Sequence, residues 1–144
     1  GARDWLSATS IDISTYFAES MDIHHIFPVA WCERHGIPRS DYNSIINKTP
    51  LSSRTNRIVG GDAPSMYLMR LRKHAGLGDE EFSMILRSHM INPAYLYSDD
   101  FDGFFNDRKE RILQRIEGAM GKRIARMEIE IEEGVFVGEE PDYE

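Results

Sequence analysis

Cysteine and long apolar runs are both scarce in this chain of 144 residues. Cys32 is its single cysteine, which excludes an internal disulfide and a zinc site built from several cysteines. One free thiol is typical of a reducing compartment, so we predict a cytoplasmic protein. No apolar run reaches the roughly 18 residues of a membrane-spanning helix, so we predict no membrane partner. No secretory signal, internal repeat or low-complexity tract is visible either.

The length and composition predict one globular domain. A chain of this size can enclose a single sizeable core, and its 41% hydrophobic and 28% charged residues are typical of soluble proteins. The sequence begins Gly1-Ala2-Arg3 rather than with Met. We therefore expect a domain excised from a longer polypeptide, or the remnant of a tag.

Acidic charge is concentrated at the C-terminal end. The formal net charge is −7, from 24 acidic and 17 basic residues. Eight of the acidic residues lie between Glu128 and Glu144, where the sequence has no Lys or Arg, and the 16 that remain nearly balance the 17 basic residues of positions 1–127. We predict a domain over 1–127 and an acidic tail over 128–144, and the charge neither supports nor excludes a nucleic-acid partner.

The apolar spacing predicts a mostly helical chain with a few short strands. β-branched and aromatic residues predict a strand over 21–27, which Pro28 ends. Residues 37–50 are typical of a loop, with a brief strand at 44–46. Helices are predicted at 29–36, 53–60, 63–76 and 80–91, with Asp79 as the N-cap of the last, and a long helix is predicted to start after 98–100.

An apolar stripe follows this long helix at spacings of 3, 4, 4, 3 and 4. It consists of Leu113, Ile116, Met120, Ile124, Met127 and Ile131. The spacing is typical of a helix face that packs on a core or on a partner, and a homodimer through the C-terminal helix is one interpretation. Residues 128–140 also alternate with a period of two, so a terminal hairpin strand stays an alternative.

Two adjacent histidines, His24 and His25, stand in the sequence DIHHIFP, followed by Asn47 in INKTPLS and Asn56 in RTNRIVGG. In this order of residues, positions 20–61 resemble the HNH, or ββα-metal, endonucleases. The longer runs NKTPLSSRTNRIVGGDAPSMYL and SHMINPAYL resemble the C-terminal nuclease portion of the GmrSD-type, modification-dependent restriction enzymes.

The resemblance implies a fold and an activity. The fold would be α+β, with a small ββα-metal core at about 20–61 embedded in a mostly helical domain that continues over 62–127. The activity would be metal-dependent hydrolysis of phosphodiester bonds in DNA, in the restriction of foreign or modified DNA. An N-terminal nucleotide-hydrolysing or specificity domain would be a partner outside this chain.

The resemblance also implies roles for the four motif residues. His25 would be the general base, because an imidazole with a pKa of about 6.5 can accept a proton near neutral pH. A carbonyl of Asn47, backbone or side chain, would orient the His25 ring. His24 and Asn56 would hold one divalent cation. Mg²⁺ and Mn²⁺ are the first candidates, and Ni²⁺, Co²⁺ and Zn²⁺ are alternatives that imidazole suits.

Three cations flank the asparagines, and we predict that Lys48, Arg54 and Arg57 position the phosphate backbone without reading sequence. An ordinary solvated face is the structural alternative for these cations, and a purely structural pair is the alternative for the histidines.

Neighbouring residues of a regular strand point to opposite faces, so His24 and His25 share a site only where the strand twists or ends. The competing function is an HNH-like module that binds nucleic acid or a protein without cleaving.

Overall fold

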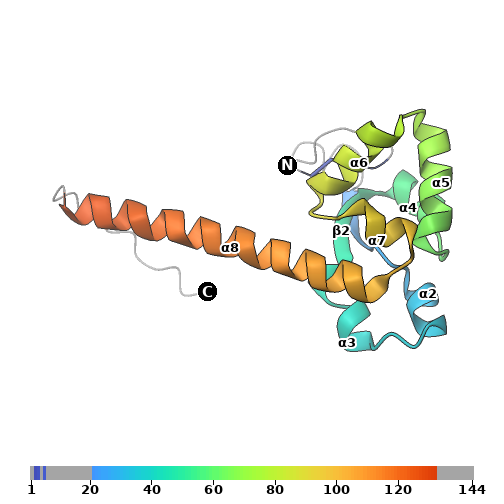
Figure 1. The fold of residues 1–144 in the computed structure, drawn as a ribbon, viewed down its shortest axis with the longest axis horizontal. Helices are drawn as coiled ribbons and strands as arrows, with labels where there is room; N and C mark the ends of the chain where they lie inside the picture. The colour runs from blue at the N-terminus through green and yellow to red at the C-terminus, as the bar shows by residue number, and fades with distance from the viewer. Residues whose placement is uncertain (1, 4, 6–20, 133–144) are drawn as a thin grey trace. The chain divides into compact units, whose positions relative to one another are not determined.

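The computed structural model describes residues 2, 3, 5 and 21–132 (Figure 1). These residues combine helices with a two-stranded antiparallel sheet, so the predicted α+β class is confirmed at this level. The chain divides into two compact units, Gly1–Glu110 and Arg111–Glu144. The predicted boundary between 127 and 128 falls inside a helix that continues to Glu132. The rest of the predicted tail, and of the alternative hairpin strand, lies outside the described residues.

The sheet is a ribbon of two strands, β1 (Met21–His25) and β2 (Lys48–Ser52), in antiparallel register. The strand predicted at 44–46 is wrong, because Ile45–Asn47 form the 3₁₀ helix η1 and the strand begins at the next residue. Its Pro50 has no N–H for a ladder, and a ribbon tolerates this because, among the described residues, each of the two strands has an edge without a partner strand.

The predicted helices are confirmed with shifted ends. They are α2 (Val29–Arg34), α4 (Ser53–Val59), α5 (Pro64–Ala75), α6 (Asp79–Ser88) and α8 (Phe101–Glu132). Two short helices, α3 (Arg39–Tyr42) and α7 (Pro93–Tyr97), were not predicted. The prediction of Asp79 as an N-cap is wrong, since Gly78 holds that position and Asp79 is the first helical residue. At that position its carboxylate still interacts favourably with the positive end of the helix dipole.

Phe27, directly after β1, lies in the middle of the buried core of the first unit. Its ring centroid is 5.0 Å from that of Trp31, 5.2 Å from that of Phe101 and 5.0 Å from that of Phe104. Aromatic rings contribute the largest apolar areas to a core, so the hairpin and the first turns of α8 are held by the same packing. Other buried members include Trp5, Ile26, Leu51, Tyr67, Leu68, Leu71, Phe82, Ile85 and Leu86.

Arg108, in α8, is a buried cation that binds the backbone where η1 leads into β2. Its guanidinium donates to the carbonyl oxygens of Ile46 at 2.5 Å and Lys48 at 2.9 Å. Its Nε donates to the carbonyl oxygen of His89 at 3.0 Å. Burial lowers the pKa of Arg108 to about 10, so the group stays charged at neutral pH. Charge-assisted hydrogen bonds of this kind are stronger than neutral ones.

Replacing Arg108 with lysine is expected to lower the free energy of unfolding by about 2 kcal/mol, because an ammonium keeps the charge but cannot form the same fork of hydrogen bonds. Urea unfolding measures the change. Lys109→Ala, at the exposed neighbouring position, is the matched control and is expected to stay within about 0.5 kcal/mol of the parent chain. Equal losses in the two variants would contradict this role of Arg108.

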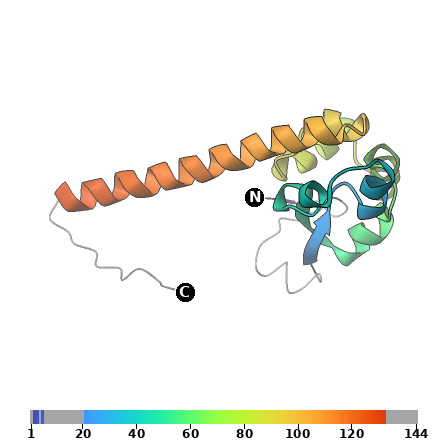
Figure 2. The ribbon, with the colours of Figure 1, turned by 90° about the horizontal axis from the view of Figure 1, so that it is seen from below.

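The helix α8 is 32 residues long, and Figure 2 shows it as one continuous helix. Its buried residues, Phe101, Phe104 and Arg108, all lie near its start. The six residues of the predicted apolar stripe are instead 43–72% exposed. None of the helices in the described ranges is long and apolar enough to cross a membrane.

Candidate functional site

The two histidines occupy the last two positions of β1. In the ladder His24 pairs with Thr49 and His25 pairs with Lys48. Paired residues share a face of the ribbon and neighbours alternate, so the two rings leave the strand on opposite faces. The strand ends at His25. A site shared by the two histidines requires the strand to twist or to end there. The strand does end there, but its side chains still alternate between the two faces.

Asn47 is fully buried and closes the loop between the two strands. Its backbone carbonyl accepts from the Ile26 N–H at 2.8 Å, and its Oδ1 accepts from the Phe27 N–H at 2.8 Å. Its Nδ2 donates to the carbonyls of Phe27 at 3.0 Å and Tyr42 at 2.9 Å. Both oxygens of Asn47 thus accept hydrogen bonds from backbone N–H groups. The described residues show no hydrogen bond from Asn47 to the ring of His25. Asn47 instead fixes the chain that follows His25.

Tyr67, from α5, also holds this segment. Its buried hydroxyl donates to the carbonyl oxygen of Ile26 at 2.7 Å. Burial raises the pKa of Tyr67 well above its usual value, so the hydroxyl stays protonated and able to donate. The ring of Trp5 stacks on it, with centroids 5.9 Å apart. The backbone after the histidines is therefore held by side chains of two different elements.

The ring of His25 has a different partner from the one predicted. Its Nε2 lies 3.2 Å from Oδ1 of Asn43, the residue that follows α3. A carboxamide oxygen only accepts, so Nε2 is the donor and Nδ1 is the nitrogen left to accept a proton. Asn43 lies in a stretch that reads as loop, where no periodic pattern distinguishes one asparagine from another. Sequence reasoning missed it for that reason.

His24 differs from His25 in that one of its ring nitrogens has no contact with solvent. Its Nε2 is buried and has no hydrogen-bond partner within the described part of the chain. Burial lowers the pKa of His24, the charge of Asp22 raises it, and the charge of His25 lowers it, with a net decrease. The ring therefore stays neutral at neutral pH, which is the form that ligates a metal.

Asp22 adds a carboxylate to the face of the ribbon that carries His24, because residues two apart on a strand point the same way. It is exposed, and its Oδ1 accepts from the Ile23 N–H at 2.8 Å. Sequence reasoning did not single it out, although the period-two alternation of the strand could have found it. Carboxylates are the side chains that Mg²⁺ and Mn²⁺ prefer.

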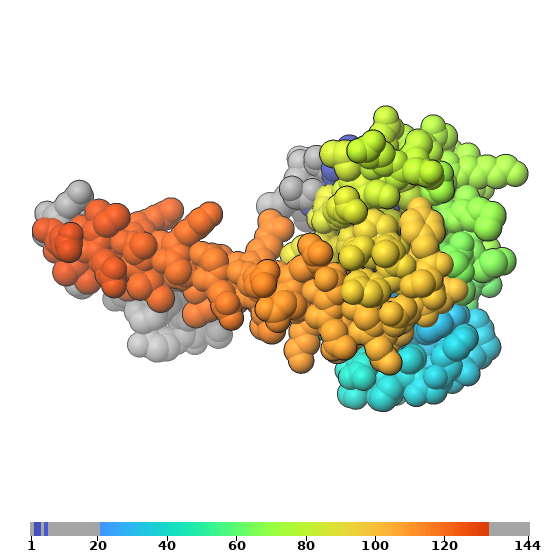
Figure 3. Space-filling view, viewed as in Figure 1, coloured from blue at the N-terminus to red at the C-terminus, as the bar shows by residue number. Residues whose placement is uncertain are grey.

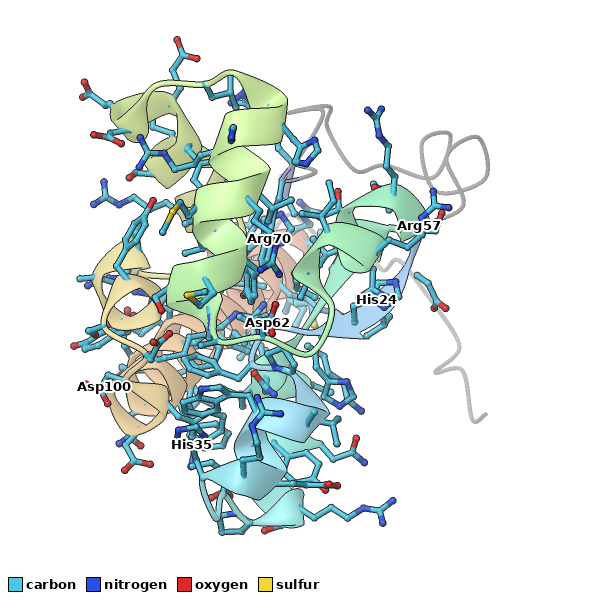
Figure 4. All side chains as sticks on the ribbon, turned by 90° about the vertical axis from the view of Figure 1, so that its right-hand side faces the viewer. His24, His35, Arg57, Asp62, Arg70 and Asp100 are labelled. Carbon is cyan, nitrogen blue, oxygen red and sulfur yellow. The ribbon has the colours of Figure 1, made fainter. Side chains whose placement is uncertain are left out.

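Asn56 lies half-buried on α4, which packs against both strands. Arg70, from α5, fixes the end of this helix by donating to the carbonyl oxygen of Ile58 at 3.0 Å. The same guanidinium pairs with Asp62 at 2.8 Å, and Figure 4 labels both residues. The short helix that carries Asn56 is thereby anchored to a longer one.

Of the three predicted phosphate-binding cations, Lys48 begins β2, the strand paired with the histidine strand, and Arg54 and Arg57 lie on α4 with Asn56. Lys48 is half-buried and pairs with His25 in the ladder, whereas Arg54 and Arg57 are exposed on α4. Figure 4 shows Arg57 on α4 and His24 on β1. The ribbon and α4 therefore combine imidazoles with positive charge.

The donor chemistry suits one divalent cation. The buried Nε2 of His24 has no hydrogen-bond partner within the described part of the chain, and the side chains of Asp22 and Asn56 carry oxygen donors. No cluster of three or more His, Cys, Asp or Glu residues occurs among residues 2, 3, 5 and 21–132. A cation here would accordingly need water or phosphate oxygens to complete its shell.

Comparisons with known proteins find one significant relative. An uncharacterized protein of Methanocaldococcus jannaschii is 27% identical to this chain over a match that covers 67% of it. The chain spans about a fifth of the length of that archaeal protein (20%). No family model matches the chain, and no solved structure matches it significantly.

Proposed function

We propose that this chain is a metal-dependent endonuclease that hydrolyses phosphodiester bonds in DNA, with a ββα-metal core made of β1, β2 and α4. The observation that supports it is the pair of unlike imidazoles at one strand end. His24 has a lowered pKa and a buried Nε2 without a partner. His25 has its ring oriented by Asn43.

His25 is the proposed general base. Because Nε2 is engaged by Asn43, Nδ1 would take the proton from the attacking water, a contribution typically worth 10²–10⁴ in rate. Lys48, Arg54 and Arg57 would hold phosphates of the bound strand, and such contacts position the backbone without reading its sequence.

His24 and Asn56, with Asp22 beside them, would hold the divalent cation, with Mg²⁺ or Mn²⁺ favoured by the oxygen ligands and Ni²⁺, Co²⁺ or Zn²⁺ by the imidazole. When bound, the cation supplies positive charge to the phosphate and to the departing oxygen. The proposed setting is the cytoplasmic restriction of foreign or modified DNA. A nucleotide-hydrolysing or specificity domain outside this chain would select the target.

Supercoiled plasmid incubated with the protein and Mn²⁺, Mg²⁺ or EDTA tests the proposal. We expect nicked or linear plasmid with a metal and intact plasmid with EDTA. Titration calorimetry with Mn²⁺ gives a second measurement, in which His24→Ala is expected to lose binding while the exposed His74→Ala keeps it. Intact plasmid under all metals, or unchanged Mn²⁺ binding in His24→Ala, would contradict the proposal.

A second candidate is a non-cleaving HNH-like module that binds nucleic acid or a protein. The observation in its favour is that His24 and His25 belong to a regular ladder and leave it on opposite faces. Retardation of DNA in a gel, equal with Mn²⁺ and EDTA and without nicking, would support the binding module over the nuclease.

A further inference from the structure

The exposed stripe of α8 contains a repeat of eleven residues. Leu113, Ile116 and Met120 recur eleven positions later as Ile124, Met127 and Ile131. Such a repeat has about 3.67 residues per turn, close to the 3.6 of a straight α-helix, so the stripe stays on one side of the helix. It spans about 27 Å at 1.5 Å per residue. In the space-filling view, side chains stand out from the helix along its length (Figure 3).

The stripe is narrow as well as continuous. At about 100° per residue its six members fall within an arc of about 80°. A helix that packs on the core of its own domain normally has a wider apolar face, whereas a narrow seam is typical of a helix paired with one other helix. Exposures of 43–72% leave this seam uncovered by the described residues.

The two flanks of the stripe carry opposite charge. Glu117 and Glu128 lie on one flank and Arg123 lies on the other, by the same helical spacing, with Arg126 about 60° further around the helix. All four side chains are exposed. Glu130 is an exception on the arginine flank. The separation of charge means that the stripe can distinguish between the two directions in which a partner helix could run.

We propose that α8 pairs in parallel with the α8 of a second copy of this chain, so that the protein is a homodimer. In a parallel pair each flank of one helix faces the opposite flank of the other. Arg123 of one copy then faces Glu128 of the second copy, five positions further along, and the contact occurs twice by symmetry. An antiparallel pair centred on the stripe would instead bring Glu117 against Glu128 of the second copy.

The apolar area is sufficient for such a pair. Each helix contributes six half-exposed aliphatic or thioether side chains, twelve in the pair. Together with the stems of the flanking arginines, this is on the order of the 1,000 Å² below which specific interfaces are rarely stable. The proposal does not rest on nuclease activity, because a dimer can form in a chain that does not cleave DNA.

Light scattering coupled to size exclusion on the full chain measures the mass, and we expect that of a dimer. Ile124→Glu places a charge in the stripe and is expected to give loss of the dimer. Ile129→Glu is the matched control, because Ile129 is 54% exposed against 55% for Ile124 and lies about 140° away around the same helix. It is expected to remain dimeric. Circular dichroism verifies that both variants keep their helix content.

Two further variants test the parallel direction. Arg123→Glu alone is expected to weaken association at least about tenfold, and adding Glu128→Arg is expected to restore it, because the exchanged pair is again opposite in sign. Leu113→Cys is expected to form a disulfide between copies under oxidation, since parallel pairing brings the two positions together. Cys32 does not compete, because it is buried and burial raises the pKa of its thiol to about 12.

Several results would overturn the proposal. A monomer at high micromolar concentration, or a trimer or larger species, would exclude the two-helix pair. Equal behaviour of Ile124→Glu and Ile129→Glu would show that the stripe is not the contact. A monomeric chain in which Ile124→Glu lowers the melting temperature would mean that the same chain covers the stripe. Absence of a cross-link in a dimeric Leu113→Cys would exclude the parallel direction.

Discussion

Asn47→Ala is expected to lower the free energy of unfolding by about 4 kcal/mol. The substitution removes three buried hydrogen bonds, those to the N–H and carbonyl of Phe27 and to the carbonyl of Tyr42. Each buried backbone group left without a partner costs about 1–3 kcal/mol. Urea unfolding followed by circular dichroism measures the loss from the shift of the midpoint at constant slope.

Asn43→Ala is the matched control for that experiment. Asn43 is exposed and its side chain hydrogen-bonds to His25, so its loss is expected to change stability by no more than about 0.5 kcal/mol. If Asn47→Ala and Asn43→Ala unfold at the same urea concentration, the carboxamide of Asn47 does not hold the loop as described.

His25→Ala is expected to lower the single-turnover rate of plasmid cleavage about 1,000-fold, within the range that general bases contribute. DNA binding should be retained, because the change removes a proton acceptor and leaves Lys48, Arg54 and Arg57 in place. The ring is at the end of the strand, and its hydrogen bond is to an exposed side chain. The fold is therefore expected to be unchanged by circular dichroism.

Two variants accompany His25→Ala. His74→Ala removes an exposed imidazole on α5 and is expected to cleave at the parent rate. Asn43→Ala tests positioning rather than chemistry. It should lower the rate by about tenfold and shift the pH profile of the rate, because the ring loses the acceptor that fixes its donor nitrogen. A His25→Ala protein as active as the parent chain would exclude His25 as the base.

Local features of the sequence were sufficient to predict most of the helices and the first strand. Pro28 was predicted to end the first strand after residue 27, whereas the strand already ends at His25. Gly60 and Gly76 end α4 and α5 with positive φ angles of 58° and 65°, which glycine adopts without strain. These signals act over a few residues, so they can be recognised without knowledge of the tertiary structure.

The second strand and the supporting residues of the site depend on contacts that are distant in the sequence. Lys48 and its neighbours form a strand because β1 pairs with them, although Pro50 argues against one. Arg108 has no local pattern that marks it as a buried donor to carbonyl groups. The roles of His24, His25, Asn56 and the flanking cations stay predictions, while Asn47 is placed by its hydrogen bonds in the support of the loop.

We expect the histidine strand to become ordered late in the synthesis of the protein. Arg108 lies 62 positions after Ile46 and 60 after Lys48, the residues whose carbonyl groups it binds. A two-stranded ribbon alone is at best marginally stable in water, and ribosomes deliver the N-terminal portion first. Nascent chains that end before Arg108 therefore contain both histidines but lack a lasting scaffold for them.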